Sequence, residues 1–321
     1  MKKVAIVTDS NSGITQKEAM GLKDVFVLPM PFTIDGEEYY EDINLTQEEF
    51  YQKLQTNAEI STSQPSIGEL CEFWEKILQD YDEIVHIPMS SSLSKSCETA
   101  LVFAENYDNK IQVVDNQRIS VTQRQAVMDA LNLAKEGKSA KEIKDFLIQT
   151  KRISSIYIMV SNLKYLKKGG RITSTAAAIG TLLRIKPVLQ IQGGKLDSFA
   201  KVMNEKVGKE KMIAAMKKDF EERFKEYVEC GQMVLNIAHT NCPEKAEEFA
   251  KQVRKEFPKV PVRFVNPLSL SVACHIGDGS LALACAFEYK EKRSAIKIRE
   301  KITITTENNE KIKMKQKIKI K

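Results

Sequence analysis

Short runs of aliphatic and β-branched residues recur in the first half of the chain, and polar residues follow them. The runs at Val4–Val7, Ile84–Ile87 and Ile111–Val114 are mostly apolar; the first leads into Thr8-Asp9-Ser10 and the last into Asp115-Asn116. Near-continuous apolar runs of this length are typical of strands buried on both faces of a parallel sheet. The pattern predicts such a sheet, with polar residues at its carboxyl edge, where α/β proteins bind ligands.

Between these runs the apolar positions take on a helical spacing. Helices are predicted at about 67–79, 94–106 and 117–136, and Ser66 with Glu69 forms a capping box at the start of the first. Strands that alternate with helices predict an α/β fold with a mostly parallel sheet.

A second block of alternating elements begins near residue 154, and 321 residues are enough for two domains. We therefore expect an N-terminal α/β domain at 1–150 and a C-terminal α/β domain at 151–289. The predicted strands are Ile156–Val160, Val188–Ile191, Met233–Ala238 and Val262–Val265, and the predicted helices are 162–168, a small apolar one from Ser174, 205–228, 243–257 and Ser280–Phe287.

The charge of the chain is unevenly distributed. The net charge is +6 overall, but residues 290–321 carry +8 and residues 1–289 carry −2. A slightly acidic body lacks the basic stripe that nucleic-acid binding needs, so no nucleic-acid partner is expected.

The C-terminal extension, 290–321, alternates Ile or Met with Lys on both sides of a polar turn, which predicts a basic hairpin from about residue 295. One interpretation is transient contact with an anionic membrane or an acidic partner. The other, which we favour, is an edge hairpin whose lysines prevent aggregation.

The cysteines and the apolar segments indicate the cellular setting. Without a CxxC pair, the cysteines suggest neither a disulfide framework nor a zinc site, and no metal is expected. The apolar start is too short for a signal peptide and no window reaches the ~18 apolar residues of a membrane span, so we expect a cytoplasmic protein. The six cysteines are Cys71, Cys97, Cys230, Cys242, Cys274 and Cys285.

Three polar segments, 61–66, 90–94 and 169–174, are each expected to form a loop that opens onto a helix. Hydroxyls and free backbone N–H groups at the positive end of a helix dipole can hold a carboxylate or a phosphate. Thr62 and Ser63 lie ahead of the predicted cap, although Ser/Thr-rich turns are also common simply as caps.

Ser94 and Arg171 are the strongest candidates in the other two segments. One hydroxyl is enough to cap a helix, so a run of four serines in five positions leaves binding and capping about equally favoured, and Ser94 directly precedes the predicted helix. Arg171 follows two glycines, Gly169 and Gly170, and would need an anion if buried.

His275 lies in a glycine-rich stretch that we expect to be a loop before the helix at 280–287. Cys274 or Ser94 with His275 could form a hydrolase or acyltransferase site, but sequence neighbours point in different directions and no Gly-x-Ser-x-Gly elbow surrounds Ser94. A hydrogen-bonding role for His275 is favoured, and a small-anion binding module is a further alternative. Gly193-Gly194-Lys195 lacks the P-loop pattern and is expected to be a hairpin turn.

Taken in order, six motifs resemble the DegV family of fatty-acid-binding proteins over about residues 1–289. They are Val-Thr-Asp-Ser (7–10), Ser-Thr-Ser-Gln-Pro-Ser (61–66), Ser-Ser-x-Leu-Ser (90–94), Gly-Gly-Arg-Ile (169–172), Ile-Lys-Pro-Val-Leu (185–189) and His-x-Gly-x-Gly (275–279). Three positions depart from the family pattern: Ser92 and Lys95 replace common glycines, and Asp278 replaces a proline.

The resemblance implies two α/β domains with a long-chain fatty acid between them and no other cofactor. It implies a non-enzymatic FakB-type subunit of a bacterial fatty acid kinase, which presents the acid to a separate ATP-dependent subunit and carries the acyl phosphate onward to phospholipid synthesis. The implied carboxylate-binding residues are Thr62, Ser63, Ser94, Arg171 and His275, and the acyl-tunnel candidates are Ala176, Ile179, Leu182 and Leu183.

Overall fold

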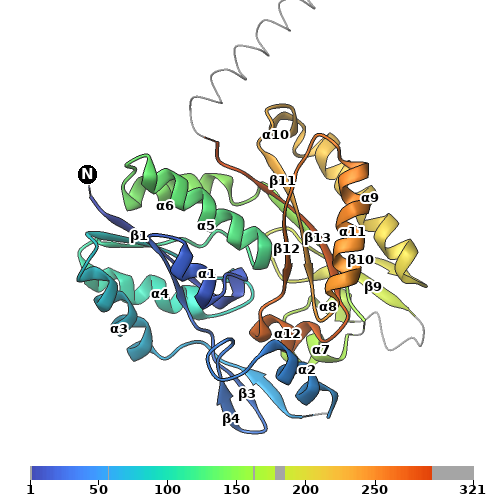
Figure 1. The fold of residues 1–321 in the computed structure, drawn as a ribbon, viewed down its shortest axis with the longest axis horizontal. Helices are drawn as coiled ribbons and strands as arrows, with labels where there is room; N and C mark the ends of the chain where they lie inside the picture. The colour runs from blue at the N-terminus through green and yellow to red at the C-terminus, as the bar shows by residue number, and fades with distance from the viewer. Residues whose placement is uncertain (1, 57, 162, 178–184, 291–321) are drawn as a thin grey trace, which may run out of the picture.

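The first half of the chain builds an entirely parallel sheet (Figure 1). The computed structural model describes residues 2–56, 58–161, 163–177 and 185–290. The strand order is β2-β1-β6-β7, and all three pairings are parallel, as the apolar runs predicted. The strands are β1 (Val4–Asp9), β2 (Val25–Leu28), β6 (Glu83–Ile87) and β7 (Ile111–Val113).

Helices cover both faces of this sheet. Ile6 packs with α1, α5 and α6, whereas Val7, on the opposite face, packs with α3 and α4. The predicted capping box at the start of α3 is confirmed, because Ser66 and Glu69 each accept from the other's backbone N–H. The helices are α1 (Gln16–Gly21), α3 (Ile67–Leu78), α4 (Ser96–Ala104), α5 (Ser120–Lys135) and α6 (Ala140–Thr150), with 3-10 turns η1 (Ser10–Ser12) and η2 (Glu105–Tyr107).

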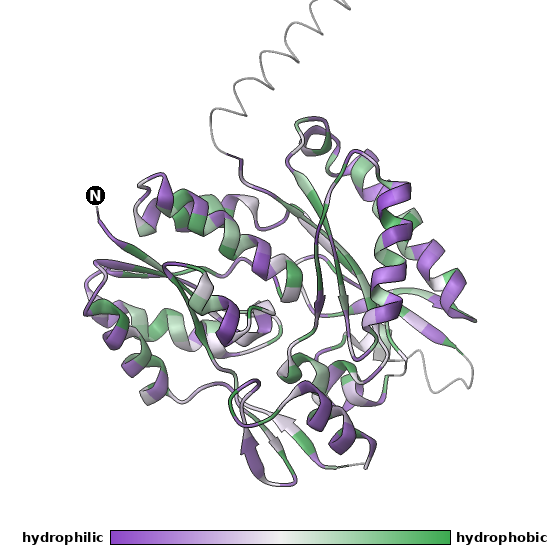
Figure 2. Cartoon of the chain, in the orientation of Figure 1, coloured by the Kyte–Doolittle hydropathy of each residue, from purple (hydrophilic) through white to green (hydrophobic). Residues whose placement is uncertain are grey.

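The second half builds a mixed six-stranded sheet, in the order β10-β9-β8-β13-β11-β12. Helices α9 and α11 cover one face, and their outward sides are hydrophilic (Figure 2). The strands are β8 (Ser154–Met159), β9 (Lys186–Ile191), β10 (Asp197–Val202), β11 (Met233–His239), β12 (Val262–Pro267) and β13 (Leu281–Phe287); the helices are α7 (Lys164–Gly169), α8 (Ser174–Ala177), α9 (Glu205–Glu222), α10 (Lys225–Glu229), α11 (Pro243–Glu256) and α12 (Leu270–Ile276). The chain thus has two α/β domains.

The predicted helix at 280–287 is wrong, because the segment forms β13, a central strand of the mixed sheet. Leu281 and Leu283 pack beneath α9 and α11, while Ala282 and Ala284 face the other way. Leu and Ala favour helices, but large and small residues alternate here with a period of two, and every residue is buried. Burial on both faces overrides the helix propensity.

A three-stranded sheet, which we did not predict, lies at the edge of the molecule. It has the order β4-β3-β5 and packs with α2 against α12. Because β3 pairs with β5 across an intervening stretch, 35–59, that contains β4 and α2, this pairing depends on contacts that local patterns do not show. The elements are β3 (Phe32–Ile34), β4 (Glu37–Tyr39), β5 (Ile60–Thr62) and α2 (Gln47–Gln55).

Three other predictions have different outcomes. The turn at 193–195 is confirmed, since it joins the antiparallel strands β9 and β10. The basic hairpin from 295 lies outside the described residues, and the predicted domain boundaries stay a prediction. In the described part of the chain, no helix has the length and apolarity needed to cross a membrane.

Candidate functional site

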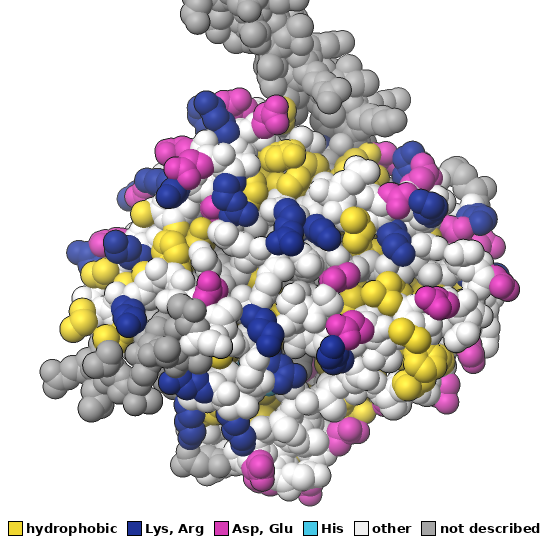
Figure 3. Space-filling model, turned by 180° about the vertical axis from the view of Figure 1, so that it is seen from behind, with side chains coloured by type: hydrophobic (Ala, Val, Ile, Leu, Met, Phe, Trp, Pro, Cys, Tyr) yellow, Lys and Arg dark blue, Asp and Glu magenta, His cyan; other side chains and the backbone are white. Residues whose placement is uncertain are grey.

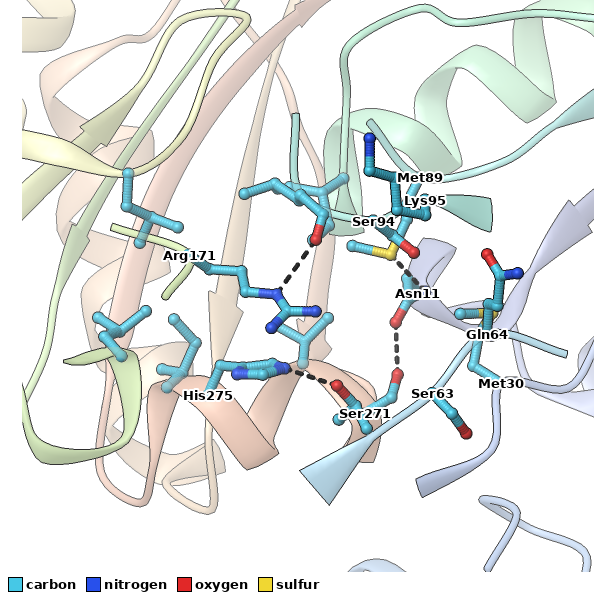
Figure 4. Close-up of a pocket in the computed structure, with 17 residues that line it drawn as sticks. Asn11, Met30, Ser63, Gln64, Met89, Ser94, Lys95, Arg171, Ser271 and His275 are labelled. Carbon is cyan, nitrogen blue, oxygen red and sulfur yellow. Dashed lines mark hydrogen bonds between the residues drawn. The ribbon is translucent and has the colours of Figure 1, made fainter. Parts of the chain in front are cut away.

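A cavity of about 180 Å³, which we call the inner cavity, lies where the two domains meet. All five predicted head-group residues line it (Figure 4). Its remaining walls are largely apolar and come from both domains, so a ligand there would contact both. The apolar lining residues are Met30, Met89, Leu93, Ile119, Leu166, Leu196, Val272 and Ile276.

Thr62 and His275 meet across this cavity. Thr62 is the last residue of β5, and its Oγ1 lies 2.9 Å from Nε2 of His275, within hydrogen-bond distance. His275 was expected in a loop, but it lies in the last turn of α12, which packs against β5. Burial, aided by the charge of Arg171, lowers the pKa of His275 to about 4. The imidazole is therefore neutral at pH 7.

Gly169 packs closely against the Nδ1 side of the imidazole ring of His275. An added Cβ at this position would overlap His275 Nδ1, so only glycine permits the observed approach. Gly169 ends α7, and Gly170 follows with φ 67°, a left-handed conformation that stops the helix. The glycine pair thus ends α7 and also makes room for the histidine.

The half-buried Arg171 ties two of the predicted loops together. Its Nε donates to the carbonyl of Leu93 at 3.3 Å, and its Nη1 donates to the carbonyl of Gly169. Both acceptors are uncharged. Among the described residues, no carboxylate lies within ion-pair distance of Arg171. A cation held by neutral acceptors beside a cavity can stabilise an anionic ligand.

The serine run at 90–94 is a hydrogen-bonded turn ahead of α4. Ser94 N–H donates to the Ser90 carbonyl at 3.2 Å, and Ser94 Oγ accepts from the N–H of Ser96 at the same distance. Ser91 donates to Asp115 at 2.6 Å. Part of the run is therefore explained by local structure, while Ser94 still borders the cavity.

Asn11, Gln64 and Ser271 also line the inner cavity, and sequence reasoning did not identify them. The amide oxygen of Asn11 accepts from the hydroxyls of Ser269 and Ser271, which orients the amide nitrogen toward Met89 Sδ at 3.0 Å. The only sequence signal for Asn11 was its place just beyond the carboxyl end of the first predicted strand.

Cys274 does not form a reactive pair with His275. Its side chain is buried in the cluster that contains Phe32 and Tyr51, and burial raises the pKa of the thiol well above its usual value. His275 Nε2 is meanwhile bonded to Thr62. In the described part of the chain, no group of three or more His, Cys, Asp or Glu side chains could hold a metal ion.

Of the four predicted tunnel residues, only Ala176 lies among the described residues. Ala176, on α8, is fully buried and packs in the same cluster as Leu166 and Leu196, which line the inner cavity. Ile179, Leu182 and Leu183 lie outside the described residues. The acyl-tunnel prediction therefore stays a prediction.

Comparisons with known proteins agree with this architecture. Residues 3–288 match the family model described as "Uncharacterised protein, DegV family". A DegV domain-containing protein of Clostridium perfringens is 33% identical over 88% of this chain and 97% of its own length, and one of Streptococcus pneumoniae is 35% identical over 88% and 98%.

Two solved structures extend the likeness to the fold. A fatty-acid-binding DegV family protein from Thermus thermophilus superposes with a TM-score of 0.80 at 26% identity, covering 89% of this chain and 99% of that one. DegV, a fatty acid binding protein from Bacillus subtilis, gives 0.75 at 28% identity, covering 90% and 100%. The family model spans both α/β domains and all the residues of the inner cavity, so this chain belongs to the DegV family.

Proposed function

We propose that this protein binds a long-chain fatty acid in the inner cavity. The observation that carries the proposal is a cavity with apolar walls whose polar residues include Thr62, Ser94, Arg171 and His275. Hydroxyls, an imidazole and a guanidinium suit a carboxylate, and the apolar walls suit an acyl chain. Solved relatives described as fatty-acid-binding support it.

The acyl chain supplies the affinity and the head group supplies the orientation. Burying about fifteen methylenes at ~0.8 kcal/mol each yields roughly 12 kcal/mol before the costs of association. Those costs are on the order of 4–15 kcal/mol, so net binding depends on head-group bonds as well. Ser63, an exposed residue at the edge of the cavity, completes the proposed carboxylate set.

We also propose that the bound acid is presented to a separate ATP-dependent kinase subunit, as the family resemblance implies. In support, Ser94 and Arg171 border a second cavity, of about 410 Å³, as well as the inner one, so a head group held by them would be reachable from that second cavity. With ATP and radiolabelled palmitate, acyl phosphate should form only when a kinase subunit is added. Formation by this protein alone would contradict the proposal.

Native mass spectrometry followed by lipid extraction tests fatty-acid binding directly. We expect near-equal stoichiometry and an affinity that rises with chain length. Val272→Asp places a carboxylate in the inner cavity and should weaken palmitate binding more than a hundredfold, because it repels the ligand and costs the cavity its apolar character.

Val102→Asp is the matched control, since Val102 is 62% exposed on α4 and does not line the cavity. It should bind palmitate as the unmodified protein does. Equal binding of acetate and palmitate would instead support the small-anion module. If neither ligand binds, the proposal is wrong.

A further inference from the structure

His86 is a buried polar side chain that the function proposed above does not use. It lies on β6 and is 2% exposed, whereas the charged side chains in Figure 3 spread over the rear surface, where solvent reaches them. In the described part of the chain, neither ring nitrogen of His86 has a hydrogen-bond partner. Burying such a group without a partner is unfavourable, so another molecule is expected to bond to it.

The imidazole of His86 is neutral at pH 7. Burial lowers the pKa of His86 to about 3, because the charged form is poorly solvated in the interior. A neutral imidazole has one N–H donor and one bare nitrogen that accepts. The ring of Trp74 packs against it nearly at right angles, with 5.5 Å between the ring centroids. A small polar molecule that both donates and accepts can therefore bond to either nitrogen.

His86 lines a pocket of about 10 Å³, which we call the His86 pocket. The hydroxyl of Ser96 lines the same pocket, and it too is buried and has no hydrogen-bond partner among the described residues. A space of roughly 10–15 Å³ is enough for one water molecule, and a buried water typically makes about three hydrogen bonds. The two orphaned groups supply two of these bonds.

Asp9 and Thr99 offer further oxygens in the His86 pocket. Asp9 accepts the backbone N–H groups of Asn11 at 3.0 Å and of Met89 at 2.7 Å, and a carboxylate has room for more than these donors. The Thr99 hydroxyl donates to Gln64 Oε1 at 3.2 Å, so its oxygen can still accept. Either residue can thus complete the bonding of a molecule in the pocket.

Water suits the His86 pocket better than an ion does. The pocket contains the carboxyl group of Asp9 and no cationic side chain, so it lacks the charge to hold an anion. Within the described ranges, no group of three or more His, Cys, Asp or Glu side chains could hold a metal ion. The volume of the pocket also leaves no room for an organic molecule.

The His86 pocket lies behind the polar wall of the inner cavity. Gln64 lines both spaces. Pro88 and Ser96, which also line the pocket, stand on either side of the serine turn, and the N–H of Ser96 donates to Ser94 Oγ at 3.2 Å. A molecule in the pocket is therefore placed to hold the segments that carry Thr62 and Ser94 in a fixed relation.

We propose that the His86 pocket binds one buried water molecule, which bonds to a ring nitrogen of His86 and to the hydroxyl of Ser96. The water joins β6 to the start of α4, and His86 acts through it as a positioning residue for Thr62 and Ser94. This positioning role rests on the fatty-acid-binding function proposed above, whereas the water site itself does not.

Two measurements on the unmodified protein test the water site. A high-resolution crystal structure should show a water within hydrogen-bond distance of His86 and Ser96. In solution, nuclear Overhauser effects should connect water with the ring protons of His86. If density for a water is absent from the pocket, or a protein group bonds to the imidazole there, the site does not exist.

Ser96→Ala and a matched control locate the water. Ser96→Ala removes one of the two proposed partners, so both the density and the water signal at His86 should be lost. Ser280→Ala removes another buried hydroxyl that has no partner among the described residues but does not line the pocket, and should leave both in place. A water that persists at His86 in Ser96→Ala, or that disappears in both variants, would contradict the proposed bonding.

Substitutions of His86 test the positioning role. His86→Phe keeps a flat ring without nitrogens, and palmitate affinity should fall about fivefold, the effect of one neutral hydrogen bond. His86→Asn places an amide near the position of Nδ1 and His86→Gln near that of Nε2, so one of them should restore the affinity. A purely steric role for the ring would instead be met by phenylalanine.

The outcomes separate this inference from the proposed function. If the water is present but His86→Phe binds palmitate as the unmodified protein does, the positioning role is wrong. If neither amide variant restores the affinity lost in His86→Phe, the water does not carry the effect. If the unmodified protein fails to bind palmitate, fatty-acid binding is wrong, while the crystal structure still decides whether the water site exists.

Discussion

The two sides of the inner cavity present their polar groups in different ways. Thr62 and Ser94, from the N-terminal domain, offer neutral hydroxyls at the end of a short strand and just before a helix. Arg171 and His275, from the C-terminal domain, are ionisable groups held by long-range contacts. In the proposed complex, the first pair would set the geometry of the bound carboxylate, whereas the second would make binding sensitive to charge and pH.

The largest expected effect is on the pH dependence of the free energy of unfolding, through His275 on the C-terminal side of the inner cavity. The pKa of His275 is about 4 in the folded protein against 6.5 ordinarily, because burial and the adjacent Arg171 disfavour the imidazolium. The unfolded chain therefore binds more protons between these values, so stability is lost as the pH falls from 6.5 to 4. The expected loss from this residue is about 3 kcal/mol.

Urea denaturation of the unmodified protein and His275→Asn at several pH values measures this contribution. Other buried groups titrate in both proteins, so the difference isolates His275. The variant should lose less stability than the unmodified protein between pH 6.5 and 4. Parallel curves would show that His275 does not titrate with a lowered pKa.

Gly169→Ala should disturb the cationic side directly, and the hydroxyl side only through the bond between His275 and Thr62. The new methyl group would displace the imidazole ring of His275 and the peptide whose carbonyl receives Arg171. Losing one charge-assisted bond costs about 2 kcal/mol, so we expect roughly 30-fold weaker palmitate binding by fluorescence competition.

Gly21→Ala is the control for this substitution. An added Cβ at Gly21 meets nothing within 4 Å, and its φ is not positive. Its palmitate affinity should match that of the unmodified protein. If Gly169→Ala also binds normally, the position of the imidazole is irrelevant to the ligand.

Thr62→Val should have a smaller effect on the hydroxyl side. Valine keeps the shape of threonine but removes the hydroxyl available to His275 and to a carboxylate. One neutral hydrogen bond contributes about 1 kcal/mol, so palmitate should bind roughly fivefold more weakly by calorimetry. Thr33→Val, on the neighbouring strand β3, removes a hydroxyl bonded to Ser61 and should leave binding unchanged. Equal losses in the two variants would contradict a specific role for Thr62.

Sequence patterns identified the features that depend on local structure. The parallel strands β1, β6 and β7 were visible as apolar runs, and α3 as a helix with its capping box. Thr62 and Ser94 could be predicted from the sequence for the same reason, because each lies near the start of a predicted helix. Arg171 and His275 were candidates from their glycine-rich segments, and the family resemblance then placed them with the carboxylate-binding residues, but the sequence alone did not reveal their surroundings.

The features that were missed depend on contacts between distant segments. Asn11 is oriented by Ser269 and Ser271, more than 250 residues away, and Glu41, just beyond β4 of the sheet that was not predicted, accepts the N–H of Leu270. β13 was misassigned because its alternating large and small residues are meaningful only between two covered faces. Propensity could not supply that environment.

Cys274→Ala should have the smallest effect and separates binding from covalent catalysis. The Cys274 thiol is buried away from the Thr62–His275 pair, and its raised pKa keeps it protonated. We expect palmitate affinity within twofold of the unmodified protein, and no acyl-enzyme adduct by mass spectrometry when either protein meets an activated acyl ester. An adduct on the unmodified protein that disappears in Cys274→Ala would instead support the cysteine hydrolase. An adduct on both proteins would direct attention to Ser94, the hydroxyl at the boundary between the two cavities.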